Sequence, residues 1–387
     1  MTAAGPDIGK TVNPETQLRP SSDTSTMTMN KKTRYTHEAF HRFIKLRLGF
    51  NFVNGLSGSP LDDLLTFSAQ YGATDVVIQS YTGKVSGERW AAFPGENASA
   101  VPGEQRWELR DLENLRKQVE SHNLHLEALE NVPTTFYDQI MLGGIKRDEQ
   151  IENMIFTVRN IARAGIPIFG YNWMPSGVWR NSENSTHRSG TTVTAYDHSK
   201  HINAQMTHFR EYTEEEMWDN LEYWIKIITP VAEEEGIRIG IHPADPPVDS
   251  VGGIPRLLNS FAAYKRLVEI VESPSNAIEF CQGTFSEMAD AKEDGIYKMI
   301  RYFGERNKIL YVHFRNVSNA GSSFKEEFIN TGHVDMYRAI KLYREIGFGG
   351  VLVNDHVPIT IGDSAWGHQG RAYANGYMQA LLDVIEN

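Results

Sequence analysis

The sequence of 387 residues contains a single cysteine, Cys281, so no disulfide bond can form within the chain. No apolar run approaches the roughly 18 residues that indicate a membrane-spanning helix, and the polar start lacks the charged-then-apolar pattern of a secretory signal. The formal net charge is −11, whereas a nucleic-acid-binding surface would be basic. These absences predict a cytoplasmic protein that binds neither membranes nor nucleic acid. They leave Cys281 as a core residue, a metal ligand or a reactive thiol.

The chain has enough apolar material for a sizeable core. Hydrophobic residues make up 40% of it and aromatic residues 11%, which argues against extended disorder. Residues 1–33 differ from the rest, because they are rich in Thr, Ser, Pro and Gly and show no apolar periodicity. We therefore expect a flexible N-terminal tail over 1–33 and one folded domain over 34–387.

Beyond the tail, short β-rich segments alternate with amphipathic helical segments, which is typical of parallel strands joined by crossover helices. The expected strands cover 45–51, 75–80, 125–132, 167–173, 238–243, 277–283, 309–316 and 350–356. The expected helices cover 61–71, 109–122, 148–164, 214–235, 257–272, 287–304, 335–346 and 370–386. Eight such units predict a (β/α)8 TIM barrel, with a doubly wound open sheet as the alternative. Segments 81–108 and 176–213 are too long for simple loops, so we expect them to be insertions on the catalytic rim.

Four residues that can bind a metal occupy equivalent places at the ends of the last four expected strands: His242, Cys281, His313 and Asp355. The carboxyl ends of barrel strands meet at one mouth, so side chains far apart in sequence can converge there. Each residue alone has an ordinary explanation, as a hydrogen-bonded histidine, a core cysteine or a helix cap. Their succession on four consecutive strands favours a metal site instead. Mixed nitrogen, sulfur and oxygen ligands suit a first-row divalent ion such as manganese, iron(II), cobalt or zinc.

Further polar residues lie around this predicted centre. The Arg315 guanidinium could bind a substrate carboxylate through two parallel hydrogen bonds. A structural ion pair at the rim of the barrel would explain this arginine equally well. Asn172 and Gln282 are further candidates for substrate binding. His356 directly follows Asp355 and titrates near neutral pH, so we consider it a general acid or base.

The motifs that carry these residues resemble those of the mannonate dehydratase family. The signature stretches are HPADPP (242–247), FCQGT (280–284), HFRNV (313–317), GHVDMY (332–337) and NDH (354–356). Further counterparts are GATDVVIQ (72–79), LENVP (129–133), the run over 147–175 and GRAYANGY (370–377), so the resemblance covers nearly everything after residue 45.

The resemblance implies a barrel of the xylose-isomerase-like type that dehydrates D-mannonate to 2-keto-3-deoxy-D-gluconate in hexuronate breakdown. It implies a divalent metal, usually manganese or iron(II), at positions matching His242, Cys281, His313 and Asp355, and an acid–base histidine matching His356. It also implies assembly into homo-oligomers.

Three departures from the family pattern affect this expectation. Ala244 stands where the family usually has an acidic residue, and Gln79 begins a turn that usually contains a histidine. Trp366 aligns with a tyrosine thought to take part in proton transfer, so His368 or Tyr373 would have to replace it. Two alternatives therefore stay open: a sugar isomerase or epimerase on the same barrel, and a catalytically silent protein that binds sugar acids.

Overall fold

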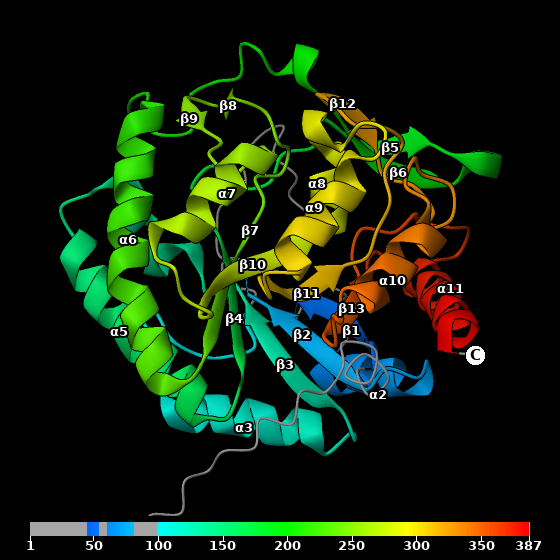
Figure 1. Cartoon of the computed structure of the whole chain (residues 1–387), viewed down its shortest axis with the longest axis horizontal. Helices are drawn as coiled ribbons and strands as arrows, with labels where there is room; N and C mark the ends of the chain where they lie inside the picture. Colours follow the sequence, from blue (N-terminus) through cyan, green and yellow to red (C-terminus); the bar gives the residue numbers. More distant parts are fainter. Residues whose placement is uncertain (1–44, 54–59, 81–98, 387) are drawn as a thin grey trace, which may run out of the picture.

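The computed structural model describes residues 45–53, 60–80 and 99–386 (Figure 1). Within these ranges, parallel strands close a barrel in the order β1-β13-β11-β10-β7-β4-β3-β2. Its strands are β1 (Arg47–Val53), β2 (Asp75–Gln79), β3 (His125–Glu130), β4 (Ile168–Asn172), β7 (Arg238–His242), β10 (Asn276–Cys281), β11 (Ile309–His313) and β13 (Val351–Asn354). Because β1 pairs with both β2 and β13, the predicted barrel is confirmed and the open sheet is wrong.

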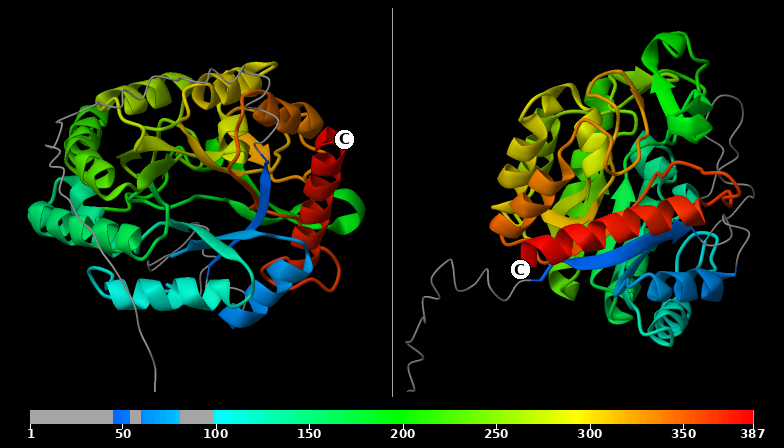
Figure 2. Two further views of the ribbon diagram at one scale, coloured as in Figure 1. Left: turned by 60° about the horizontal axis from the view of Figure 1, so that its bottom comes forward. Right: turned by 90° about the vertical axis from the view of Figure 1, so that its right-hand side faces the viewer.

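Helices surround the barrel (Figures 1 and 2), and α11 runs alongside β1. They are α2 (Leu61–Gln70), α3 (Leu109–Glu120), α4 (Asp138–Leu142), α5 (Arg147–Arg163), α6 (Glu214–Glu235), α7 (Phe261–Ile270), α8 (Gln282–Glu287), α9 (Gly295–Gly304), α10 (Met336–Glu345) and α11 (His368–Glu386). Within the described ranges, every helix is too short or too polar to traverse a lipid bilayer. The predicted tail over 1–33 and most of the predicted insertion over 81–108 lie outside the described residues.

Local signals fix the ends of α6. The hydroxyl oxygen of Thr213 accepts a hydrogen bond from the backbone nitrogen of Glu216 at 3.2 Å, and the Glu216 carboxylate accepts one from the backbone nitrogen of Thr213 at 2.8 Å. This capping box satisfies two backbone donors that the first turn would otherwise leave unpaired. The helix ends at Gly236, whose φ of 70° suits a residue without a Cβ atom.

One boundary differs from the sequence prediction in a way that affects the site. The strand expected over 277–283 ends at Cys281, and the next residues already form α8. The Cys281 sulfur caps this helix, because it accepts a hydrogen bond from the backbone nitrogen of Thr284 at 3.5 Å. The helix expected over 287–304 begins only at Gly295, as α9.

The segment over 176–213 builds a small antiparallel sheet beside the barrel (Figure 1). Its strands β5 (Ser182–Thr186) and β6 (Thr192–Asp197) pair with each other, and β6 also pairs with β12 (Ser323–Lys325) from the loop after β11. A bridge between Thr192 and Ile359 ties the same sheet to the segment after β13. The insertion is therefore fastened to the loops that follow two of the predicted ligand strands. A further short hairpin, β8 (Ser250–Val251) and β9 (Ile254–Pro255), follows β7.

Side chains alternate between the barrel interior and the surrounding helices, because successive residues of a strand face opposite sides. In β2, Val76 and Ile78 belong to the large core beneath the helices, whereas Val77 belongs to a separate cluster that includes Tyr311 and Val353. Gln79, at the carboxyl end of β2, lies two residues after Val77 and therefore also faces the interior. The apolar filling of the barrel thus gives way to polar side chains near the mouth.

The amino ends of the first three strands carry an ion-pair cluster. Arg47 pairs with Asp75, and its Nη2 lies 2.6 Å from Oε1 of Glu127. The Nδ1 atom of His125 lies 3.2 Å from carboxylate oxygens of both Asp75 and Glu127. In a barrel this end contributes to stability rather than catalysis.

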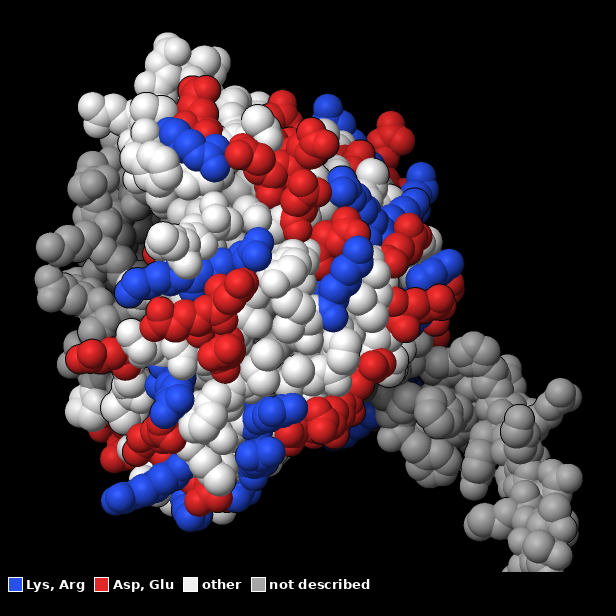
Figure 3. Space-filling view, turned by 90° about the vertical axis from the view of Figure 1, so that its left-hand side faces the viewer, with Lys and Arg blue, Asp and Glu red and all other residues white. Residues whose placement is uncertain are grey.

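Acidic and basic side chains are interspersed on the face shown in Figure 3. The helices α5 and α6 lie on this side of the molecule (Figure 1), and they pair through Arg159 with Glu234 and Arg163 with Glu235, at 3.0 and 3.3 Å. This face therefore carries no large patch of one sign.

Candidate metal centre

Three of the four predicted metal ligands come together at the carboxyl ends of neighbouring strands. His242, Cys281 and His313 each offer one ligand atom within 4.8 Å of the others. They are the last residues of β7, β10 and β11, whose pairing places Cys281 directly opposite His313. The fourth, Asp355, follows β13, and its Oδ2 lies 3.6 Å from Nδ1 of His313. The arrangement follows from the pairing register of the strands and from the alternation that turns every second side chain of a strand into the barrel.

Both imidazoles have one nitrogen occupied by the protein. Nδ1 of His242 lies 2.7 Å from the carbonyl oxygen of Pro243, which leaves Nε2 as the ligand atom. Nε2 of His313 lies 2.9 Å from Oε2 of Glu130, and its buried Nδ1 has no hydrogen-bond partner among the described residues. Metal-binding histidines in proteins are usually held in this way, with the second nitrogen donating to a carbonyl or carboxylate. The residues present therefore fit a metal ion.

Cys281 and Asp355 are held in the anionic forms that bind metals. Burial alone would raise the pKa of the Cys281 thiol, but Arg315 and His242 bring it well below its usual value. Burial likewise opposes ionisation of Asp355, whereas His356 and His313 hold the pKa of its carboxyl well below the usual range. A thiolate and a carboxylate beside two imidazoles form a set suited to a first-row divalent ion.

Arg315 lies beyond the end of β11 and is fully engaged by the protein. Its Nε lies 3.0 Å from Oδ2 of Asp355. Its two terminal nitrogens contact Glu287 at 2.9 Å, Glu326 at 2.8 Å, Thr284 at 2.9 Å and Asp245 at 3.3 Å. Arg315 could bind a substrate carboxylate through two hydrogen bonds only if some of these existing bonds were broken. Substrate binding by Arg315 stays a prediction, and the structure shows the ion-pair arrangement.

A second buried arginine, Arg180, joins the same network from the rim insertion. Its guanidinium pairs with both oxygens of Asp245, and Nη2 lies 2.8 Å from Oε1 of Glu326. Charged groups this deeply buried persist only when they are paired. Sequence reasoning missed Arg180 and Glu326, because both lie in irregular segments whose position depends on the small sheet.

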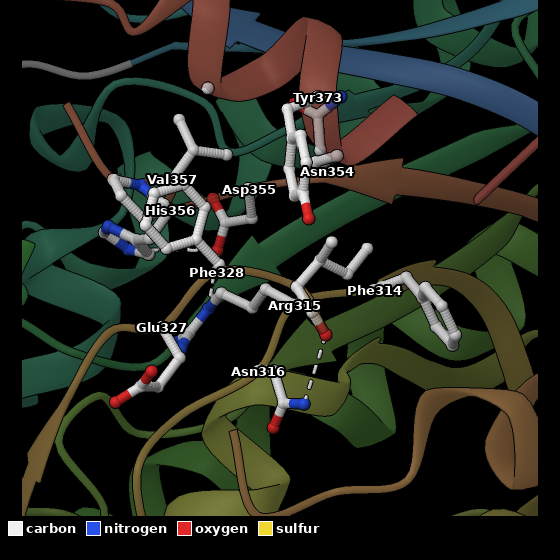
Figure 4. A pocket seen from close by; sticks show the side chains of 14 residues that line it. Phe314, Arg315, Asn316, Glu327, Phe328, Asn354, Asp355, His356, Val357 and Tyr373 are labelled. Carbon is white, nitrogen blue, oxygen red and sulfur yellow. Dashed lines mark hydrogen bonds and ion pairs between the residues drawn. The ribbon is translucent and has the colours of Figure 1, made fainter. Parts of the chain in front are cut away.

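His356 lies next to the centre, with Nε2 3.8 Å from Oδ2 of Asp355. Together with Asp355, Phe328 and Tyr373 it lines a cavity between the loop after β11 and helix α11 (Figure 4). Burial lowers its pKa below the ordinary 6.5, although Asp355 opposes this shift. A neutral imidazole at this place can accept a proton.

The other two predicted substrate-binding residues lie in different surroundings. Asn172 ends β4 directly opposite His242, and its amide nitrogen donates to Oδ1 of Asn131 at 3.0 Å. Gln282, in contrast, is buried between α8 and α10, where it accepts a hydrogen bond from the Tyr343 hydroxyl at 3.2 Å. The structure therefore places Asn172 beside the predicted ligands and turns Gln282 toward the outer layer. Gln282 faces outward because α8 begins at this residue, where the sequence predicted a strand.

Trp366 lies outside the barrel, in the apolar layer between β1, α2 and α11. Its ring packs against Phe50, Phe52 and Phe67, with centroid distances of 6.4, 6.3 and 5.6 Å. His368 packs against the same Phe67 ring at 4.9 Å. The indole is thus a packing residue, and its presence does not show that a proton carrier has been lost from the site.

Tyr373 is the remaining candidate for the second proton carrier. It lines the cavity that His356 also lines (Figure 4). Its hydroxyl donates to Oδ1 of Asn330 at 3.0 Å. Of the residues considered as replacements for the family tyrosine, Tyr373 alone borders that cavity.

Comparison with known proteins identifies the family of this chain. The family model described as D-mannonate dehydratase (UxuA) matches residues 69–207 and 199–387. A mannonate dehydratase of Streptococcus uberis is 32% identical over 308 residues, which cover 73% of this chain and 85% of that protein. The crystal structure of mannonate dehydratase from Streptococcus suis serotype 2 has a TM-score of 0.74 at 28% identity, over 88% of this chain and 94% of that chain. An L-ribulose 3-epimerase shares only the fold, with a TM-score of 0.53 and 12% identity over 88% of this chain and 95% of its own. This chain therefore belongs to the D-mannonate dehydratase family.

Proposed function

We propose that this enzyme removes water from D-mannonate to form 2-keto-3-deoxy-D-gluconate. The observation that carries the proposal is the convergence of His242, Cys281 and His313 within 4.8 Å, in a chain of this family. In the reaction, a proton leaves C2 and hydroxide leaves C3, so that together they make one water. The resulting enol then becomes the 2-keto group.

The family is metal-dependent, and we assign the ion to His242, Cys281, His313 and Asp355, with manganese or iron(II) as the metal. When bound there, the ion supplies Lewis-acid stabilisation of negative charge on the substrate carboxylate. The pairing of Asp355 with Arg315 keeps this ligand oriented, and the carbonyl of Pro243 fixes the ring of His242.

The proton transfers fall to residues of this chain at the edge of the centre. His356 has a lowered pKa and borders the cavity beside Asp355, so we assign it one of the two transfers, at C2 or at the departing hydroxyl. Tyr373 borders the same cavity and is our candidate for the other. Asn172 is the predicted substrate-binding residue that we retain, because it lies on the inner face opposite His242.

A substrate panel tests the proposal. Purified protein reconstituted with Mn²⁺ or Fe²⁺ is assayed for 2-keto-3-deoxy acid from D-mannonate and its epimers, alongside Cys281→Ser. We expect activity on D-mannonate in the wild type and a loss of at least about 10-fold in the variant. No product from any aldonate with either metal would contradict the proposal and favour a silent sugar-acid-binding protein.

A further inference from the structure

A second buried polar layer lies one step deeper in the barrel than the predicted ligands. Its members surround Nε2 of His313: Oε2 of Glu130 lies 2.9 Å from it, the side-chain nitrogen of Asn51 3.3 Å, and Oε1 of Glu279 3.4 Å. All of these side chains are buried. The other carboxylate oxygen of Glu130 accepts a hydrogen bond from the amide nitrogen of Gln79.

This layer decides which nitrogen of His313 carries the proton. The amide nitrogen of Asn51 would favour an unprotonated Nε2, whereas Glu130 favours a protonated one. The contact with the carboxylate is shorter and charge-assisted, and such bonds are roughly twice as strong as neutral ones. When Nδ1 binds a metal ion on the side of Cys281 and Asp355, its lone pair is used there and the ring proton lies on Nε2, toward Glu130.

We propose that Glu130 is a positioning residue, which fixes the tautomer and the ring orientation of His313 for metal binding. This inference rests on the metal centre of the proposed function. Gln79 holds Glu130 in place through a side chain that does not titrate, at the position where the family usually has a histidine-containing turn. Gln79 on β2 thus holds Glu130 on the neighbouring β3, and Glu130 reaches across the barrel to support His313 on β11.

The same residues could instead hold an ion of their own, since Glu130, Glu279 and His313 also offer ligand atoms within 4.8 Å of one another. That arrangement would require His313 to lose its remaining proton and to bind two ions through both nitrogens. The bond from Gln79 already uses one oxygen of Glu130. We therefore expect a single ion at the carboxyl ends of the strands.

The test measures metal binding directly and does not depend on turnover. Wild type, Glu130→Gln and Glu130→Leu are titrated with Mn²⁺ and Co²⁺ against a chelating dye, and bound metal is counted by elemental analysis. Glu127→Gln is the matched control, because it removes another buried carboxylate from the same strand, at the end that pairs with Arg47.

We expect Glu130→Leu to bind both ions about 10–100-fold more weakly, with a smaller loss in the isosteric Glu130→Gln and little change in Glu127→Gln. The absorption bands of bound Co²⁺ should shift in Glu130→Leu, because the ligand ring is no longer held. If the leucine variant does not fold, the glutamine variant decides by the same measurement.

Wild-type affinity in the folded Glu130 variants would overturn the inference, and so would a second ion in each wild-type chain that is lost in the Glu130 variants but kept in Glu127→Gln. A wild type that binds no divalent ion would overturn both the inference and the proposed centre. Weakened binding in the variants together with a wild type inactive on D-mannonate would support the inference and contradict the proposed function only.

Discussion

The Nε atom of Arg315 lies 3.0 Å from Oδ2 of Asp355, the same oxygen that lies 3.6 Å from Nδ1 of His313. Arg315 therefore links a predicted metal ligand to the buried carboxylates of Asp245 and Glu326. Since each nitrogen of its guanidinium already has an acceptor, we interpret Arg315 as the residue that neutralises and orients the acidic side of the centre.

Replacing Arg315 should destabilise the folded protein. Arg315→Met leaves several buried carboxylates without their cation, so we expect the free energy of unfolding to fall by about 3–5 kcal/mol, measured by urea denaturation. The exposed pair of Arg338 with Asp294 provides the control, and Arg338→Met should change stability very little. Equal effects of the two substitutions would show that the buried network does not stabilise the fold.

Removing the proposed acid–base histidine should affect chemistry and leave metal binding intact. We expect His356→Asn to slow turnover by about 10²–10⁴-fold, because a positioned proton carrier contributes that much. Metal content should stay at the wild-type level. His368→Asn is the control, since His368 packs against Phe67 and Trp366 away from the cavity. Comparable losses of turnover in both variants would refute the assignment.

Trp366 should matter for stability and not for turnover. Its ring packs against three phenylalanines, so Trp366→Phe should lower the free energy of unfolding by about 1–3 kcal/mol. Assayed below its melting temperature, the variant should turn over D-mannonate as fast as the wild type and with the same KM. Turnover that is slower by about an order of magnitude in the folded variant would place Trp366 in the chemistry after all.

The ion-pair cluster at the amino end of the barrel predicts a pH dependence of stability. Hydrogen bonds to Asp75 and Glu127 raise the pKa of His125 from 6.5 to about 9 in the folded protein. The charged imidazole therefore stabilises the fold fully below pH 6.5, and this contribution disappears as the pH rises through about 9.

We expect His125→Gln to lower the Tm at pH 6 and to have a smaller effect at pH 10. The change should be modest, because the His125 side chain is half exposed and solvent screens its pairs. A Tm difference between wild type and variant that is the same at both pH values would contradict this explanation.

Much of this structure could be predicted from the sequence, because the barrel follows from regular patterns. Strand and helix periods place His242, Cys281 and His313 at equivalent strand ends, and barrel closure then brings them together. The alternation of side chains along β10 could also have predicted that Glu279 faces the barrel interior, because it lies two residues before Cys281 on the same strand.

Other parts of the site depend on contacts that no local pattern encodes. Gln282 was expected on a strand, but the cap that Cys281 provides to Thr284 starts α8 there and turns Gln282 outward. Arg180 reaches Asp245 from the insertion, whose small sheet pairs with β12. The alignment of Trp366 with a catalytic tyrosine is uninformative about the site, since the ring packs outside the barrel.

We propose that this enzyme expels water from D-mannonate rather than only exchanging its C2 proton. The most direct measurement is NMR spectroscopy of D-mannonate turned over in D₂O by the Mn²⁺- or Fe²⁺-loaded protein. The carbons are detected through ¹³C, because positions that exchange with deuterium lose their proton signals. We expect a new keto carbon and a deoxygenated C3, with no epimer accumulating. Deuterium exchange or epimerisation at C2 with the C3 hydroxyl retained would contradict it and identify an epimerase on the same barrel.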